Sequence, residues 1–219
     1  MTRMLPLFPL SKPLFPGALM PLRLFEGRYL RLFREHADND PFLGVVMTKV
    51  GWEVDDEPVT HLIGTSARLL ALAPGPHESL EIALQGLSRF KIHTVDWSRT
   101  YAMGEVDWYG DHVNELDGID ALARRAISTY DGFKHAISAR MHIEFPDDPL
   151  PCEPAELSYG LADRLPCNTW ELQRLLEAPS VDHRLRSLVA IIERERTLFE
   201  RHGATGPAIE HPGQRFLPN

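Results

Sequence analysis

The sequence has few cysteines, no long apolar run and no excess of basic residues. Only Cys152 and Cys167 occur in 219 residues. Two cysteines do not make the disulfide framework of a small secreted domain, and we expect both thiols to be reduced. No segment reaches the roughly 18–20 consecutive apolar residues that a membrane-spanning helix needs. The formal net charge is −8, so the chain lacks the basic surface that attracts nucleic acid. These absences predict a cytoplasmic protein that binds neither membranes nor nucleic acid.

The sequence also lacks the motifs of common catalytic and metal sites. It contains no Gly-x-x-x-x-Gly-Lys-Ser/Thr loop for nucleotide phosphates and no Gly-x-Ser-x-Gly turn for a nucleophilic serine. His142-Ile-Glu144 and Cys152 resemble part of a zinc deaminase signature, but that signature needs Cys-x-x-Cys and the next cysteine is Cys167. His135 and His142 are seven residues apart, a spacing more typical of a solvated helix face. We therefore expect no catalytic residue, metal or cofactor.

The first thirty residues alternate apolar residues with prolines. Each proline removes a backbone donor and fixes φ, so this segment cannot be a long helix, and the residue before each proline is extended. Phe15-Pro-Gly17 predicts a turn in which Gly17 adopts a positive φ. We therefore predict a strand, a tight turn, a second extended run and then a helix that begins at Phe25.

The rest of the chain falls into two halves with different apolar periods. Residues 1–112 contain short apolar runs separated by Gly and Pro, which predict a sheet sandwich or small barrel with one inserted helix. The predicted strands after that helix cover residues 42–50, 59–63, 67–73, 80–84, 90–95 and 101–109, with a break at Gly86. Residues 113–202 show helical spacing and predict a helical bundle, and residues 203–219 an extended tail. Asn168 and Ser180 are the expected starts of the last two helices. The predicted fold class is therefore α+β.

The amino-terminal pattern resembles the start of the substrate-binding domain of Lon proteases. The shared elements are Leu-Pro-Leu-Phe-Pro, then Phe-Pro-Gly, then Pro-Leu-Arg-Leu-Phe-Glu-Gly-Arg-Tyr. Gly86-Leu-Ser-Arg-Phe-Lys-Ile92 is similar to a strand of that family, and residues 157–194 are similar to its closing helices. The resemblance thus covers about the first 200 residues. The matching motif residues are Pro9, Phe15, Pro16, Gly17, Pro21, Leu22, Arg23, Phe25, Glu26, Arg28, Tyr29, Gly86, Arg89 and Phe90.

The resemblance implies a PUA-like pseudobarrel of strands around a helix, followed by a helical bundle. It also implies a non-enzymatic module that binds exposed hydrophobic segments of unfolded or damaged proteins, with a separate protease or chaperone as a possible partner. The ATPase and serine–lysine protease modules of a full Lon protease are not found in this sequence, which favours a stand-alone binding domain. Two alternatives stay open, a small-ligand or RNA-binding module of similar fold and an uncharacterised hydrolase.

Most motif residues are expected to be structural. We expect Glu26 to pair with Arg23 or Arg28 or to cap backbone groups, Arg89 to brace a loop, and Gly17 and Gly86 to serve backbone geometry. The apolar residues expected in the core, where each stabilises the fold by roughly 1.5–3 kcal/mol, are Phe8, Leu14, Phe15, Leu22, Leu24 and Phe25.

Contact with a polypeptide is predicted for aromatic residues at strand ends. Such side chains can stay partly exposed, and one ring buries a large area in an interface. The groove between the two halves is a second expected location. The aromatic candidates are Trp52, Trp97, Trp108 and Tyr109.

Overall fold

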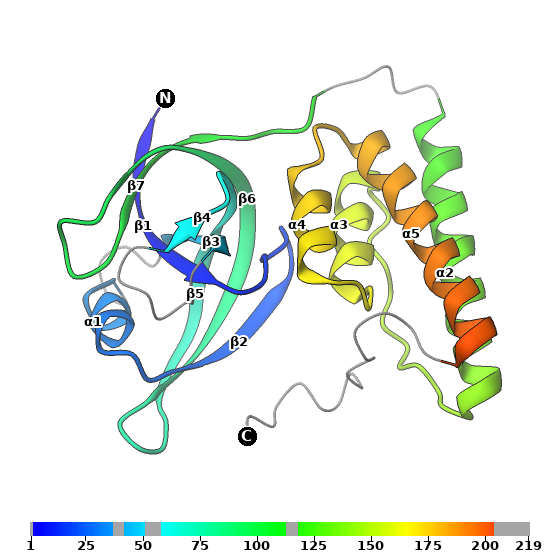
Figure 1. The fold of residues 1–219 in the computed structure, drawn as a ribbon, viewed down its shortest axis with the longest axis horizontal. Coiled ribbons are helices and arrows are strands. Elements are labelled where there is room, and N and C mark those ends of the chain that lie inside the picture. The colour runs from blue at the N-terminus through cyan, green and yellow to red at the C-terminus, as the bar shows by residue number, and fades with distance from the viewer. Residues whose placement is uncertain (1, 37–41, 51–57, 113–117, 204–219) are drawn as a thin grey trace. The chain divides into compact units, whose positions relative to one another are not determined.

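The protein was analysed as a computed structural model, which describes residues 2–36, 42–50, 58–112 and 118–203. The chain divides into two compact units, Met1–Asp111 and His112–Asn219. Every strand in the described ranges belongs to the first unit, together with one helix, and the second unit contains four helices. The fold class is therefore α+β, as predicted (Figure 1). The two units are described separately below.

The strands of the first unit pair in a ring. Its elements are β1 (Arg3–Leu10), β2 (Leu19–Leu24), α1 (Gly27–His36), β3 (Phe42–Val50), β4 (Val59–Thr60), β5 (Ile63–Pro74), β6 (Leu80–Asp96) and β7 (Met103–Trp108). The strand order is β1-β7-β6-β5-β3-β4, and β1 also pairs in parallel with β3. The pairings of β1, β7, β6, β5 and β3 therefore close on themselves, while β2 pairs with β6 outside this ring.

Glycines make room for large side chains inside the ring. A Cβ atom on Gly44 or Gly64 would lie 2.8 or 2.7 Å from the Phe90 ring, and one on Gly104 would lie 2.8 Å from the Leu7 side chain. Phe90 and Leu7 are both almost fully buried. Because cores are close-packed, these contacts show that the ring interior is filled by side chains.

The amino-terminal turn has the predicted geometry. Gly17 adopts φ +81°, and the Ala18 amide donates to the Phe15 carbonyl oxygen over 3.1 Å. The following helix differs by two residues from the prediction, since α1 begins at Gly27 and not at Phe25. The Glu26 carbonyl oxygen accepts hydrogen bonds from the amides of Tyr29 and Leu30. Glu26 is therefore the residue that precedes the first helical turn.

The predicted break at Gly86 is wrong, because β6 runs through it as one strand of 17 residues. A Cβ atom on Gly86 would lie 2.1 Å from the Phe15 carbonyl oxygen. The Gly86 amide also donates to the Ala18 carbonyl oxygen, and the Gly17 amide donates to that of Gly86. Gly86 thus allows the close approach of a second backbone, a use of glycine that leaves a strand intact.

Two further strand predictions need correction. The predicted strand 59–63 is divided, since β4 covers only Val59–Thr60 and Ile63 already belongs to β5. The strand predicted over 67–73 is accordingly longer and begins at Ile63.

The second unit consists of α2 (Ile119–Met141), α3 (Pro154–Arg164), α4 (Thr169–Glu177) and α5 (Val181–His202). The Asn168 side chain accepts from the Glu171 amide over 2.9 Å and also donates to the Glu171 carboxylate. The Ser180 hydroxyl accepts from the His183 amide. Both predicted helix starts are therefore confirmed as capping residues. The predicted tail lies outside the described residues, except for Gly203.

Helix α5 supplies much of the core of this unit. It packs against α2 and α3, and Leu185, Leu188 and Ile192 on one side of it are fully buried. In the described parts of the chain, every helix is too short or too polar to cross a membrane.

Candidate polypeptide-binding surface

Most apolar motif residues form the core of the first unit. Phe15, Tyr29 and Phe90 are each less than 4% exposed, and the rings of Phe8 and Tyr29 meet edge to face at 4.7 Å. Pro9 is buried as well, whereas Leu22 is partly buried and packs against this core. These positions stabilise the fold and present little surface to a ligand.

Phe25 is an exception, and its predicted place in the core is wrong. Its side chain is 73% exposed. Phe25 falls between the end of β2 and the start of α1, where Leu24 and Tyr29 occupy the inward-facing positions on either side of it. The short connection therefore directs the Phe25 ring away from the core.

The charged motif residues near β2 and α1 form ion pairs. Glu26 accepts from Arg28 over 3.1 Å, whereas Arg23 pairs with Glu81 of β6 over 3.0 Å. Of the two partners predicted for Glu26, the structure therefore assigns Arg28. Arg28 also lies over the Tyr29 ring, 4.8 Å from its centre.

Arg89 is buried at the end of the first unit and pairs with Asp111. Its side chain is 2% exposed and donates to the Asp111 carboxylate over 2.8 Å. The guanidinium lies 4.6 Å from the centre of the Tyr109 ring, and the Tyr109 amide donates to the Arg89 carbonyl oxygen. Tyr109 is accordingly half-buried, and part of its ring is committed to Arg89.

The aromatic contact candidates lie in different surroundings. Trp97 is half-buried and packs against the core cluster that contains Phe90, while Trp108 is half-exposed at the end of β7. Trp52 lies outside the described residues. The structure thus offers Trp108 as an accessible ring, whereas Trp97 packs on the core cluster and Tyr109 on Arg89.

Exposed apolar residues also lie on three further strand segments, where sequence analysis singled out Pro21 but not the exposed leucines. Strand β2 pairs with the first part of β6, and this part of β6 pairs with the second half of β5. We call these three segments the arm: residues 19–24, 68–74 and 80–85 (Figure 1). The inward-facing side chains of the arm belong to the core cluster, namely Met20, Leu24, Leu80, Ile82 and Leu84.

The outward side of the arm carries apolar residues as well. On β2, Pro21 lies opposite Ala83 of β6. On β5, the other neighbour of β6, an irregularity between Leu69 and Ala71 places both Leu70 and Ala71 opposite Ala83. Leu19 lies two residues before Pro21 and therefore on the same side of β2. We call the set Leu19, Pro21, Leu70, Ala71 and Ala83 the arm face.

The arm face carries two exposed leucines. Leu19 is 60% exposed and Leu70 is 50% exposed, and both lie within ordered strands. The ion pair between Arg23 and Glu81 borders the set on one side, and on the other Gln85 and Arg68 lie in the same row as Leu19. Exposed apolar residues within a polar rim are typical of binding surfaces.

Part of this surface could have been read from the sequence. In Leu19–Leu24, strand alternation places Met20, Leu22 and Leu24 on the inward side. Leu19 and the polar Arg23 therefore face outward. Leu70 gives no such signal, because it lies within an unbroken apolar run and its outward position depends on the irregularity in the register.

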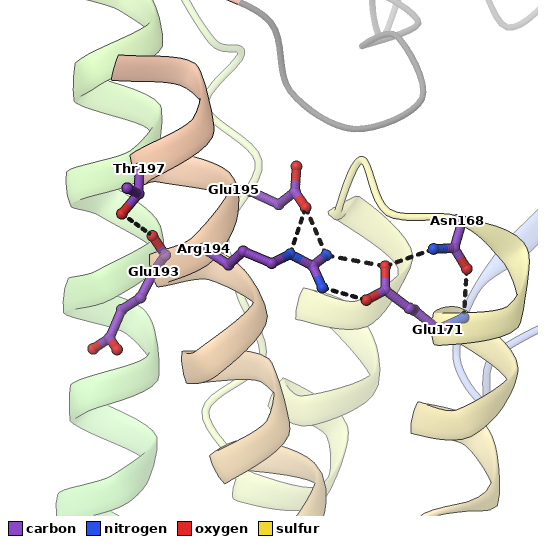
Figure 2. A network of polar contacts seen from close by, with 6 residues as sticks. All are labelled: Asn168, Glu171, Glu193, Arg194, Glu195 and Thr197. Carbon is purple, nitrogen blue, oxygen red and sulfur yellow. Dashed lines mark hydrogen bonds and ion pairs between the residues drawn. The ribbon is translucent and has the colours of Figure 1, made fainter. Parts of the chain in front are cut away.

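The second unit contains a polar network that joins α4 to α5 (Figure 2). Arg194 of α5 donates to both carboxylate oxygens of Glu171 and to Glu195, and Glu171 in turn contacts the capping residue Asn168. Hydrogen bonds from Arg194 lower the pKa of the Glu171 carboxylate, and those from Glu171 and Glu195 raise the pKa of Arg194. The network ties two helices together.

The two cysteines lie in different surroundings. Both cysteines are free, with Cys152 exposed and Cys167 buried. Burial raises the pKa of the Cys167 thiol to about 12, and the nearby Glu171 and Glu195 add to this. In the described ranges, no group of three His, Cys, Asp or Glu residues could hold a metal ion.

Comparison with known families agrees with the resemblance in the sequence. The family model described as the ATP-dependent protease La (LON) substrate-binding domain matches residues 4–194. The chain belongs to this family. The Lon family resemblance is thereby confirmed, and substrate recognition in proteolysis is the role that the family description assigns.

Similar relatives are Lon proteases. The chain is 23% identical to the Lon protease of Brevibacillus choshinensis, over 97% of this chain and 28% of the relative. It is 26% identical to that of Roseiflexus castenholzii, over 89% of this chain and 24% of the relative. The chain therefore spans about a quarter of the length of these curated relatives, and the match is to the substrate-binding domain.

Solved Lon domains have a similar fold. A crystal structure of a Lon N-terminal domain protein from Xanthomonas campestris matches with a TM-score of 0.61 and 26% identity, over 86% of this chain and 98% of that chain. The N-terminal domain of Mycobacterium avium complex Lon protease matches with a TM-score of 0.65 and 19% identity, over 87% and 98%. At 19% identity, the second match supports the fold alone.

Proposed function

We propose that the chain is a non-enzymatic polypeptide-binding module that captures exposed apolar segments of unfolded or damaged proteins on the arm face. The first unit would be a PUA-like pseudobarrel that presents this face, and the second a helical bundle. A protease or chaperone would act on the captured client. The membership in a substrate-binding family supports the general role.

The observation that carries the proposal is the exposure of Leu19 and Leu70 on ordered strands. Native proteins bury most of their apolar side chains, whereas unfolded chains expose them, so an apolar surface discriminates between the two. Fully burying a leucine contributes roughly 1.5–3 kcal/mol, and the loss of translational freedom opposes binding. We therefore expect an affinity in the micromolar range or weaker, which permits release of the client.

The test is retention of a client protein on the immobilised chain, with the client either native or permanently unfolded by reduction and alkylation. The unfolded form should be retained and the native form should pass through. The variant Leu19→Ser/Leu70→Ser should lower the affinity by roughly tenfold or more, since each apolar anchor contributes about 1 kcal/mol.

The matched control is Val59→Ser/Leu62→Ser, which changes two apolar residues of the same unit with exposures of 57% and 50%. This control should bind the unfolded client as the natural chain does. Equal retention of native and unfolded client, retention of neither, or equal loss in both variants would contradict the proposal.

A further inference from the structure

The two borders of the arm face differ in charge. On one border, the Arg23 guanidinium donates to the Glu81 carboxylate over 3.0 Å, so the two charges offset each other. On the other border, Arg68 is exposed, and within the described part of the chain it forms no ion pair. The positive charge of Arg68 is therefore accessible to a ligand.

The register places Arg68 on the same side of the sheet as Leu19. Arg68 lies opposite Gln85 of β6, and Gln85 lies opposite Leu19 of β2. Residues directly opposite each other in a sheet have their side chains on one side. Neighbouring strands are about 4.8 Å apart, so the backbones of Arg68 and Leu19 are separated by roughly 10 Å. An extended segment of about three or four residues spans this distance.

An aromatic ring orients the Arg68 side chain. Arg68 lies opposite Phe42 of β3, and its guanidinium lies 5.3 Å from the centre of the Phe42 ring. The Arg3 guanidinium lies 5.8 Å from the same centre. A ring attracts cations but does not neutralise their charge. This part of the sheet therefore gathers two positive charges and holds one of them beside the arm face.

The charge beside the arm face is opposite in sign to that of the whole chain. The formal net charge is −8, which disfavours acidic ligands in general. Physiological salt screens exposed charges beyond about 8 Å, so a ligand on the arm face responds mainly to the guanidinium nearest to it. The group of an ordinary polypeptide that complements a guanidinium is a carboxylate.

We propose that Arg68 determines the specificity of the arm face and selects client segments in which Asp or Glu lies within about three or four residues of the apolar anchors. This inference rests on the proposed function, because it takes the arm face as the client site. In the described ranges, β5 beyond Arg68 pairs with β6 alone. The carboxylate reaches Arg68 both from a segment that crosses the strands and from one that adds to this edge, so the side-chain charge alone carries the selection.

The experiment measures the affinities of fluorescent peptides that differ in one residue. All contain the same leucines in a Gln/Ser background, with Glu, Gln or Lys before the leucines in one series and after them in the other, so that both chain directions are sampled. In at least one series, the Glu peptide should bind the natural chain about two- to fivefold tighter than the Gln peptide, as for an exposed ion pair. The Lys peptide should bind more weakly than the Gln peptide, and about 1 M NaCl should abolish these differences.

Variants of the chain assign the preference to one side chain. Arg68→Gln should abolish it, and Arg68→Glu should reverse it so that the Lys peptide binds most tightly. The matched control is Arg99→Glu, which makes the same charge change at another exposed arginine of the first unit, in the connection between β6 and β7. This control should keep the preference for Glu. Because all these changes are at exposed positions, thermal unfolding should confirm that each variant is folded.

The outcomes separate the inference from the proposed function. The inference alone is overturned if the three peptides bind the natural chain equally, if Arg68→Glu keeps the preference for Glu, or if Arg99→Glu removes that preference as well. In each of these cases Leu19→Ser/Leu70→Ser still weakens capture of the unfolded client. If neither the peptides nor the unfolded client bind, the proposed function fails and the inference fails with it.

Discussion

The two units differ in how many large apolar side chains they expose and in which charged side chains they bury. Of the large apolar side chains that the described chain exposes, eight belong to the first unit and three to the second. Among the described residues, the second unit also buries the charged Arg184 and Glu195, and the first unit buries Arg89 in the same way. Exposed apolar surface favours binding, whereas buried polar contacts fix how helices pack. The comparison therefore favours recognition by the first unit and a supporting role for the second.

Arg184 illustrates the interior of the helical unit. Its guanidinium donates to the Ser158 hydroxyl over 2.7 Å and lies 3.9 Å from the centre of the Tyr159 ring. These contacts join α5 to α3. A buried arginine needs such partners because desolvation of its charge is unfavourable.

The largest effect on stability is expected for Arg184→Ala. The change leaves a cavity and removes contacts between α3 and α5, so the free energy of unfolding of the helical unit should fall by about 2–5 kcal/mol. Urea denaturation followed by hydrogen exchange resolves the two units. The control is Arg186→Ala, two residues along the same helix and largely exposed, which should change stability by less than about 0.5 kcal/mol. Equal effects of the two variants would refute the buried role of Arg184.

Gly86→Ala should have the next largest effect, and it should fall on the first unit. The added Cβ atom would lie 2.1 Å from a backbone oxygen, which cannot move away as a flexible side chain can. We expect a loss of about 1–3 kcal/mol. Gly27→Ala provides the control, since nothing lies within 4 Å of its Cβ position. If Gly86→Ala is as stable as the natural chain, the Phe15 carbonyl oxygen does not approach Gly86 as closely as described.

The network of Figure 2 predicts a smaller, pH-dependent effect. Arg194 lowers the pKa of Glu171 in the folded state, so the ion pair stabilises the fold. This stabilisation is complete above the unfolded pKa of about 4.3. It is lost as the pH falls through the folded value. Arg194→Gln should therefore lower stability by about 1 kcal/mol at neutral pH, and the difference from the natural chain should shrink in acid.

The control for this network is Arg196→Gln. Arg196 pairs with Glu200 on the surface of the same helix, and both side chains are about half exposed. We expect little change in stability at any pH. A pH-independent loss in Arg194→Gln would mean that packing, and not the ion pair, accounts for its effect.

The smallest effect on stability is expected for Leu19→Ser/Leu70→Ser. Both side chains are mostly solvated, so thermal and urea unfolding should shift by less than about 0.5 kcal/mol per site. The same variant should lose client binding. A large loss of stability would place these leucines in the scaffold and would weaken the contrast between the two units.

Local signals were read correctly from the sequence, and contacts between distant segments were not. The turn at Gly17 and the caps at Asn168 and Ser180 depend on neighbouring residues only. The strand break predicted at Gly86 is wrong because this glycine accommodates the backbone of Phe15, which is distant in sequence. Phe25 was misread because its apolar character was taken to mean burial, although Leu24 and Tyr29 fill the inward positions. Leu70 was missed because its outward position follows from the pairing of β5 with β6.

The most direct test of the account is methyl NMR of the natural chain, titrated with a permanently unfolded client. We predict that the methyl signals of Leu19 and Leu70 shift or broaden in proportion to bound client, while those of Leu62 and of Leu198 in the helical unit stay unchanged. Shifts confined to Leu198 and Met141, with Leu19 and Leu70 unaffected, would contradict the account and assign client binding to the helical unit.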